Sequence, residues 1–200
     1  MEDKKEKENK NEENLKKASV EGAAAEIVQR YGSANKEHLV AYSGIDNEIN
    51  KKLKKSLDSI SKEKINPDYE FQNTQQQAGF AAEVKDTART NAENIIASKK
   101  ERKVRTDDID RVNDELYDHM TVDENGNIID GTGSQMKFIG ASQKDPTGIG
   151  APERALNKLK SKKFEKYLDA NAKIEVPYDY YDKMQQIADE QINKLEKQVE

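Results

Sequence analysis

Apolar residues in the first half of the chain recur at steps of three and four, the spacing of amphipathic helices. Ser19 and Gly32 bracket a short stretch of this kind, as N-cap and C-cap. Residues 33–62 carry a longer apolar stripe, and residues 74–98 carry an apolar stripe of small side chains. Pro67 separates the two stretches, because proline disfavours helical geometry in the residue before it. The pattern predicts three helices, and the stripe of the second one is Leu39, Tyr42, Ile45, Ile49, Leu53, Leu57 and Ile60.

Short strand-like runs replace this pattern in the middle of the chain. Residues 117–122 and 134–138 alternate polar and apolar side chains, and Asn125-Gly126 between them is a strong hairpin signal because both residues tolerate positive φ. After a further helical stretch, residues 173–177 read as a last strand and a polar helix follows from Tyr180. We therefore expect an α/β (α+β) fold, with a small central mixed sheet of three or four strands flanked by helices and long helices at both ends.

The division into regions follows from composition. Residues 1–17 contain six acids, six bases and little that could be buried, which predicts a disordered charged leader. The rest divides into an N-terminal helical region (18–64), an α/β core (65–178) and a C-terminal helix (179–200). With 34% hydrophobic and 36% charged residues, the chain supports only a modest core.

Several classes of site are excluded by residue type. The chain has no cysteine and two histidines, His38 and His119, which rules out disulfides, thiolate catalysis and Cys-type or His-rich zinc clusters. An oxygen-ligated metal remains possible. No apolar run reaches membrane-spanning length and the N-terminus lacks a signal-peptide core, so we expect a cytoplasmic protein without a membrane partner.

Positive charge gathers in two short segments, although the net charge is −5. Residues 99–105 and 153–167 each carry a local charge of +4 and lie on either side of the predicted hairpin. Such segments are typical either of a solvated surface or of phosphate contact. The residues expected to bind nucleic acid are Lys99, Lys100, Arg102, Lys103, Arg105, Lys160, Lys162 and Lys163.

Candidate chemistry lies on the third helix and the two strands. Glu83 is the only charge in the neutral stripe Gln76, Gly79, Glu83, Thr87, Asn91 and Asn94. Asp118 lies in the first strand, and Gln135 and Lys137 share one face of the second because strand side chains alternate. His119 then points away from Asp118, and we expect it to be structural. Two alternatives remain. Glu83 could be a surface residue without a function, and Gln135 and Lys137 could be solvent-facing residues of an edge strand.

The order of a helix with Glu83, a strand with Asp118, a strand with Gln135-x-Lys137, a helix and a last strand resembles the PD-(D/E)XK (restriction-endonuclease-like) nuclease superfamily over residues 74–180. Gln135 stands where an acid is commoner. The resemblance implies a catalytic set of Glu83, Asp118, Gln135 and Lys137. It also implies Mg²⁺ (or Mn²⁺) on Asp118, Glu83 and Gln135, with Lys137 stabilising charge on the phosphate.

Two functions are compatible with these features. The first is a metal-dependent, nuclease-like phosphodiesterase, a Mg²⁺-dependent endonuclease acting on DNA or RNA. The alternative is a non-catalytic interaction or scaffold protein, whose helices at 33–62 and 178–200 dock partner-protein helices. Such a protein could be an inactive nuclease-fold module of a larger bacterial or phage protein, as in mobile elements.

Overall fold

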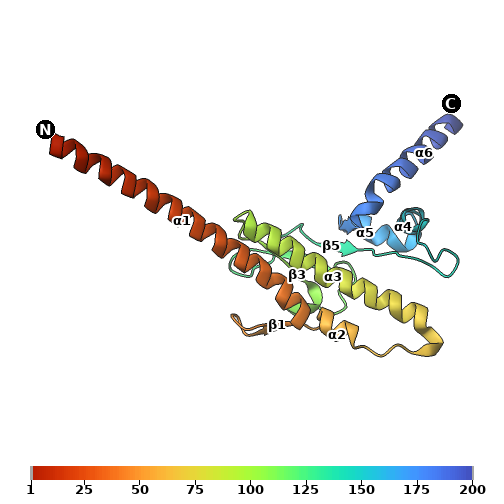
Figure 1. Cartoon of the computed structure of the whole chain (residues 1–200). Coiled ribbons are helices and arrows are strands. Elements are labelled where there is room, and N and C mark those ends of the chain that lie inside the picture. Colours follow the sequence, from red (N-terminus) through yellow and green to blue (C-terminus); the bar gives the residue numbers. More distant parts are fainter. Residues whose placement is uncertain (1, 200) are drawn as a thin grey trace.

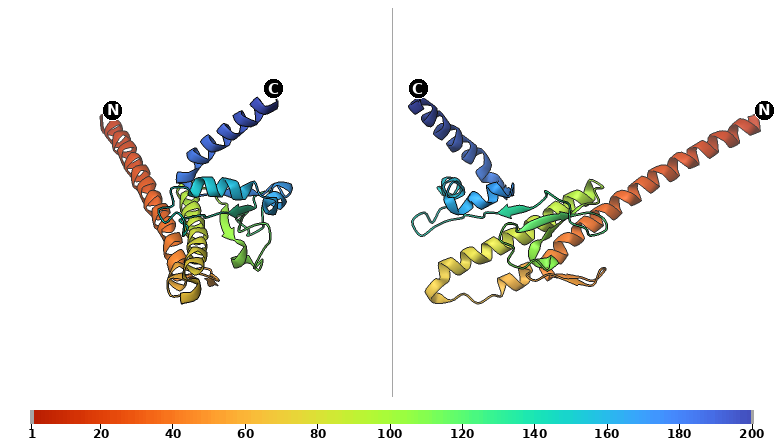
Figure 2. Two further views of the ribbon diagram at one scale, coloured as in Figure 1. Left: turned by 90° about the vertical axis from the view of Figure 1, so that its right-hand side faces the viewer. Right: turned by 180° about the vertical axis from the view of Figure 1, so that it is seen from behind.

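Two long helices, α1 (Glu2–Ser43) and α3 (Glu70–Ile96), lie side by side along much of the molecule (Figures 1 and 2). The computed structural model describes residues 2–199, so Met1, the first residue of the predicted leader, lies outside the described part. Ala41 of α1 packs against Val84 and Ala88 of α3, together with Ile60 of α2 (Leu57–Ser61). Small side chains let the two helices approach closely, and the alanine stripe of α3 therefore meets α1 as well as the sheet.

Helix α1 is longer than the sequence pattern predicts. It begins at Glu2, within the segment predicted to be a disordered leader. It also passes Gly32, so the prediction that a helix ends there was wrong. Lysine and glutamate are good helix formers, and a single internal glycine costs a helix only about 1 kcal/mol. The helix formers of this segment therefore favour continuation of α1 through it.

The helix predicted over 33–62 is also corrected. The chain leaves α1 at Gly44, whose φ of 77° is readily adopted only by glycine, and a Cβ there would lie 2.8 Å from the Cβ of Ser56. The hairpin of β1 (Ile45–Asp46) and β2 (Lys51–Lys52) follows. Ile45 and Ile49 of the predicted stripe are consequently exposed, so helical spacing in the sequence did not correspond to a helix.

A four-stranded mixed sheet forms the centre of the fold, as predicted. Its order is β3 (Arg102–Arg105), β4 (His119–Val122), β5 (Ser134–Met136) and β6 (Lys173–Glu175). The first two pairings are antiparallel, and β5 and β6 are parallel. Strand β3 was not predicted, because it lies within the basic segment 99–105.

Two asparagines of α3 bind the free edge of β3. The Asn91 side chain donates to the Lys103 carbonyl (3.0 Å) and accepts from the Lys103 N–H (2.7 Å), as a neighbouring strand would. Asn94 donates to the Glu101 carbonyl (3.1 Å). Unpaired backbone groups at a sheet edge are costly when buried, and these amides satisfy them. Part of the neutral polar stripe of α3 therefore holds the sheet in place.

Helices α4, α5 and α6 lie on the side of β5, away from the start of α1 (Figure 1). Helix α4 (Ala151–Leu159) packs against α6 (Tyr181–Val199), and α5 (Glu165–Asp169) leads into β6. None of the helices in residues 2–199 is long and apolar enough to cross a membrane. Short 3₁₀ turns complete the structure at Pro67–Tyr69, Thr106–Ile109, Lys162–Phe164 and Tyr178–Tyr180.

A substitution at Gly133, just before β5, tests the packing of the hairpin. A Cβ at this position would lie 2.4 Å from Cδ1 of the Tyr117 ring. We expect Gly133→Ala to lower the free energy of unfolding by about 1–3 kcal/mol, because the ring must move. Urea denaturation measures the change. Gly79→Ala is the matched control: its Cβ meets nothing within 4 Å on α3, so it should stabilise the protein by about 1 kcal/mol. Equal effects would contradict this account.

Candidate functional site

Asp118 is held immediately before β4 by hydrogen bonds to β5 and to the turn that follows β3. Its N–H donates to the Ser134 carbonyl (2.8 Å), and its carbonyl accepts from the Thr106 N–H (2.9 Å). Its carboxylate oxygen Oδ2 accepts the Met136 N–H (2.8 Å) and a hydrogen bond from the Gln135 side-chain amide. The sheet register thus brings together the acid of one predicted strand and the glutamine of the next.

Lys137 reaches the same region from the end of β5. Its N–H donates to the Glu175 carbonyl (2.8 Å), which extends the pairing with β6. Its Nζ lies 5.6 Å from the ring centroid of Phe164 and 5.3 Å from that of Tyr167. Burial lowers the pKa of Lys137, whereas the charges of Asp118 and Glu83 partly oppose this shift. The lysine is therefore close enough to both acids to interact with them.

Glu83 projects from α3 toward Asp118. Its Oε2 lies 3.6 Å from Nε of Arg105, and its side chain is 18% exposed. Burial and then repulsion from Asp118 raise its pKa from 4.5 to about 7, although Arg105 partly offsets both effects. Burial raises the pKa of Asp118 as well, against the Met136 hydrogen bond and the charge of Lys137. The two acids line a cavity of about 310 Å³, together with Phe80, Thr106, Asp107, Asn113 and Asp114.

These groups have the donor chemistry of a magnesium site. Mg²⁺ prefers carboxylate and carbonyl oxygens, which Asp118, Glu83 and the amide of Gln135 supply. The Met136 N–H donates to Asp118 and so fixes this carboxylate at β5. Burial raises the pKa of both carboxyls despite the nearby Arg105 and Lys137, and a bound divalent cation would favour their ionised forms. The residues therefore fit Mg²⁺ or Mn²⁺.

The raised pKa of Glu83 predicts a pH-dependent stability. Its folded-state pKa, about 7, exceeds its value of 4.5 in a solvated chain. Stability should therefore fall as the pH rises from about 4.5 through 7, because the folded protein must ionise a buried acid, at a cost of up to about 3 kcal/mol. Urea denaturation between pH 4.5 and 8 should show a flatter profile for Glu83→Gln than for the wild type. Parallel profiles would show that Glu83 does not titrate in this range.

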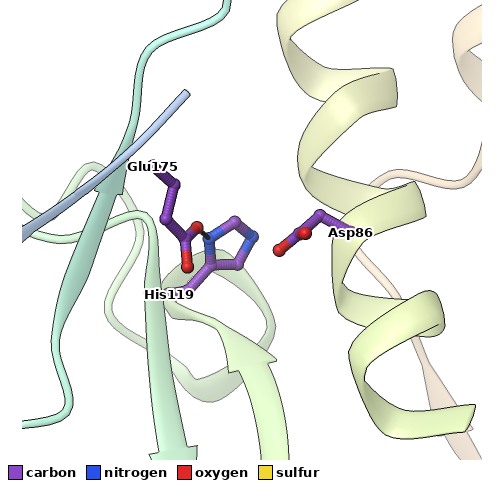
Figure 3. Close-up of side chains that lie close together, drawn as sticks. All are labelled: Asp86, His119 and Glu175. Carbon is purple, nitrogen blue, oxygen red and sulfur yellow. Dashed lines mark hydrogen bonds and ion pairs between the residues drawn. The ribbon is translucent and has the colours of Figure 1, made fainter. Parts of the chain in front are cut away.

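His119 lies on the opposite face of the sheet from the Asp118 carboxylate, as strand alternation predicts. It is fully buried beneath α3, where its Nδ1 is 3.1 Å from Glu175 Oε2 and its Nε2 is 3.3 Å from the Glu83 carbonyl oxygen. Figure 3 shows the ring between Glu175 and Asp86 of α3. The Lys103 ammonium pairs with both of these acids. The sequence analysis missed this cluster, because its members are up to 89 positions apart and no local pattern joins them.

Two residues of the first basic segment are not available for phosphate contact. Lys103 and Arg105 were predicted to bind nucleic acid, but they are 8% and 2% exposed. They occupy alternate positions of β3 and therefore point toward α3, where acids surround them. In contrast, Lys99 and Lys100 are exposed, with Lys100 paired to Glu124 (2.5 Å). The remaining residue of the set, Arg102, donates to the carbonyls of Lys99 and Glu101.

The second basic segment, residues 153–167, lies beside Lys137. Charges on Lys158 and Lys166 help to lower the pKa of Lys137, which places both near it. Lys162 and Lys163 are exposed in the turn before α5, and Lys160 donates to Gln191 (2.6 Å). This segment, rather than residues 99–105, supplies positive charge next to Lys137. The sequence showed its charge but not its position.

Comparisons with protein-family models, with curated proteins and with solved structures found no significant match. A functional assignment for this chain therefore depends on its own geometry.

Proposed function

We propose that the protein is a metal-dependent phosphodiesterase of the nuclease type, acting on DNA or RNA. One observation carries the proposal: Glu83, Asp118, Gln135 and Lys137 converge at one end of a mixed sheet, from a helix and two adjacent strands. Burial raises the pKa of both carboxyls and lowers that of Lys137, and repulsion from Asp118 adds to the shift of Glu83. Acids with perturbed pKa values that line a cavity are typical of a catalytic centre.

The chain's residues divide the work of phosphodiester hydrolysis. Bound Mg²⁺ or Mn²⁺ would supply Lewis acidity and a water of lowered pKa. Asp118, Glu83 and the Gln135 carbonyl oxygen would hold the cation, and hydrogen bonds from Gln135 and Met136 orient Asp118. The Lys137 ammonium would stabilise the negative charge that develops on the phosphate.

Substrate contact is expected from the second basic segment. Lys158 and Lys166 lie near Lys137, and the exposed Lys162 and Lys163 extend the positive charge along the same turn. Phosphate contacts of this kind position a nucleic acid without reading its sequence. The proposed substrate is therefore a DNA or RNA backbone, whose binding weakens as salt concentration rises.

The test is cleavage of labelled single-stranded and double-stranded DNA and RNA by the full chain with Mg²⁺ or Mn²⁺. We expect cleavage of at least one substrate, and its loss when EDTA removes the metal. Folded protein that cleaves none of the four substrates with either metal would contradict the proposal, as would cleavage that persists in EDTA.

A second candidate, docking of partner helices, has support from α1. Arg30 donates to the Ile96 carbonyl and to Ser98 at the end of α3, so the part of α1 before it projects beyond α3 (Figure 1). That part carries exposed apolar side chains, among them Val20, Ile27 and Val28. An exposed apolar series on a projecting helix favours partner binding. This surface of α1 is separate from the site formed by Glu83, Asp118, Gln135 and Lys137, so the two functions are compatible in one chain.

A further inference from the structure

His119 has the hydrogen-bond arrangement of a metal-ligating histidine. Its Nε2 lies 3.3 Å from the backbone carbonyl oxygen of Glu83, which can only accept, so this nitrogen donates its proton there. An N–H donated to a backbone carbonyl is the usual support of a histidine metal ligand. The other nitrogen, Nδ1, lies 3.1 Å from the Glu175 carboxylate, where either a proton or a cation can lie between the two groups.

A third donor completes the group. Asp86 of α3, His119 of β4 and Glu175 of β6 each offer a ligand atom, and these atoms lie within 4.8 Å of one another (Figure 3). In a tetrahedral zinc site with bonds of about 2.1 Å, neighbouring ligand atoms are roughly 3.4 Å apart. The 3.1 Å between His119 and Glu175 is already close to this spacing. The Asp86 carboxylate would have to move inward, and the Lys103 ammonium, which contacts both acids, would have to leave.

Lys103 currently provides the positive charge. Its ammonium pairs with Asp86 and Glu175, so two partly exposed carboxylates share one positive charge. A divalent ion in place of the ammonium would balance both carboxylates. The displaced lysine has space, because a cavity of about 610 Å³ borders Lys103 and all three donors. The same cavity would admit the ion and a water ligand.

We propose that Asp86, His119 and Glu175 bind Zn²⁺, with an open fourth position toward the cavity and with Lys103 as the internal competitor. Imidazole nitrogen together with carboxylate oxygen suits Zn²⁺, whereas the all-oxygen donor set around Asp118 suits Mg²⁺. The two sites lie on opposite faces of the sheet. The zinc site does not depend on the proposed nuclease function, and it would link α3 to β4 and β6.

Isothermal titration of the untagged full chain with ZnCl₂ tests the proposal, in a series of single-site variants. We expect one Zn²⁺ per chain, with affinity lowered at least tenfold in His119→Gln and in Asp86→Asn. Lys103→Met should bind Zn²⁺ at least tenfold more tightly, because the competing ammonium is gone. His38→Gln, at the exposed histidine of α1, is the matched control and should bind Zn²⁺ as the wild type does.

Nitrogen-15 NMR of the wild-type imidazole rings gives a readout that requires no variant to fold. We expect the Nδ1 resonance of His119 to shift on addition of one equivalent of Zn²⁺, while the resonances of His38 do not shift. A His119 spectrum unchanged by Zn²⁺ would mean that the metal does not bind this ring. That result, or Zn²⁺ binding equal in the wild type, His119→Gln and Asp86→Asn, would overturn the proposal.

Discussion

Asp118→Ala is expected to lower metal-dependent cleavage by at least about a hundredfold to a thousandfold, as is usual when a group that stabilises transition-state charge or its metal is removed. The Asp118 carboxylate accepts hydrogen bonds from both the Gln135 amide and the Met136 N–H, so its loss removes a proposed metal ligand and the contact that orients another. Lys137→Ala should reduce cleavage to a similar extent, with metal binding retained. Single-turnover cleavage with Mg²⁺ measures both.

Two matched controls separate this effect from general damage. Asp130→Ala removes an exposed acid of the same hairpin, and Lys144→Ala removes an exposed lysine in the loop after β5. Both should cleave at the wild-type rate. Because the Asp118 carboxylate also has a structural hydrogen bond, Asp118→Asn and circular dichroism check that the loss is chemical rather than a failure to fold. Metal-dependent cleavage retained in both Asp118→Ala and Lys137→Ala would rule out this site.

Arg105→Met is expected to be the most destabilising single substitution that we predict, at about 3–5 kcal/mol, because it leaves buried acids without their cation. Arg105 is 2% exposed and lies 3.6 Å from Glu83, 3.3 Å from Asp107 and 3.7 Å from Asp108. It also donates to the Lys55 carbonyl (3.1 Å). Methionine retains much of the volume but none of the charge. Urea denaturation at pH 7 measures the loss.

The control for Arg105 lies on the same strand. Arg102 is only partly buried, and its recorded hydrogen bonds go to the carbonyls of Lys99 and Glu101, so Arg102→Met should cost less than about 1 kcal/mol. A second readout concerns Glu83, whose pKa Arg105 holds down. Without Arg105 the folded-state pKa of Glu83 should be higher than in the wild type. The fall in stability with rising pH should therefore extend above pH 7 in Arg105→Met. Equal stability of the two variants would contradict a structural role for Arg105.

The central sheet separates two kinds of polar cluster. Gln135 and the Asp118 carboxylate meet on one face, whereas Lys103, His119 and Glu175 point toward α3 on the other. Glu83 belongs to both, because its carboxyl interacts with Asp118 while its backbone carbonyl accepts from His119. The position of α3 on the sheet therefore determines where the Glu83 carboxyl lies. Contacts on the α3 face support the geometry of the candidate magnesium site.

Much of this arrangement could be predicted from local sequence signals. Asn125-Gly126 marked the hairpin, and alternation in the two strands placed Gln135 and Lys137 on one face and His119 opposite Asp118. The order of helices and strands indicated a mixed sheet, which the structure has. Turn preferences and strand alternation act between neighbouring residues, so they are readable in the sequence itself.

Other features were decided only by the tertiary structure. Nothing local identifies Arg102–Arg105 as a strand, because a buried lysine and arginine are stable only beside Asp86, Glu175 and Glu83, which lie elsewhere in the chain. The stripe over 33–62 had helical spacing, yet the close approach of Gly44 to Ser56 ends the helix. The sequence by itself therefore determined the hairpin and the residues it presents. Long-range charge pairing and close packing, which depend on distances between distant segments, decided the edge strand, the buried histidine cluster and the partners of each charge.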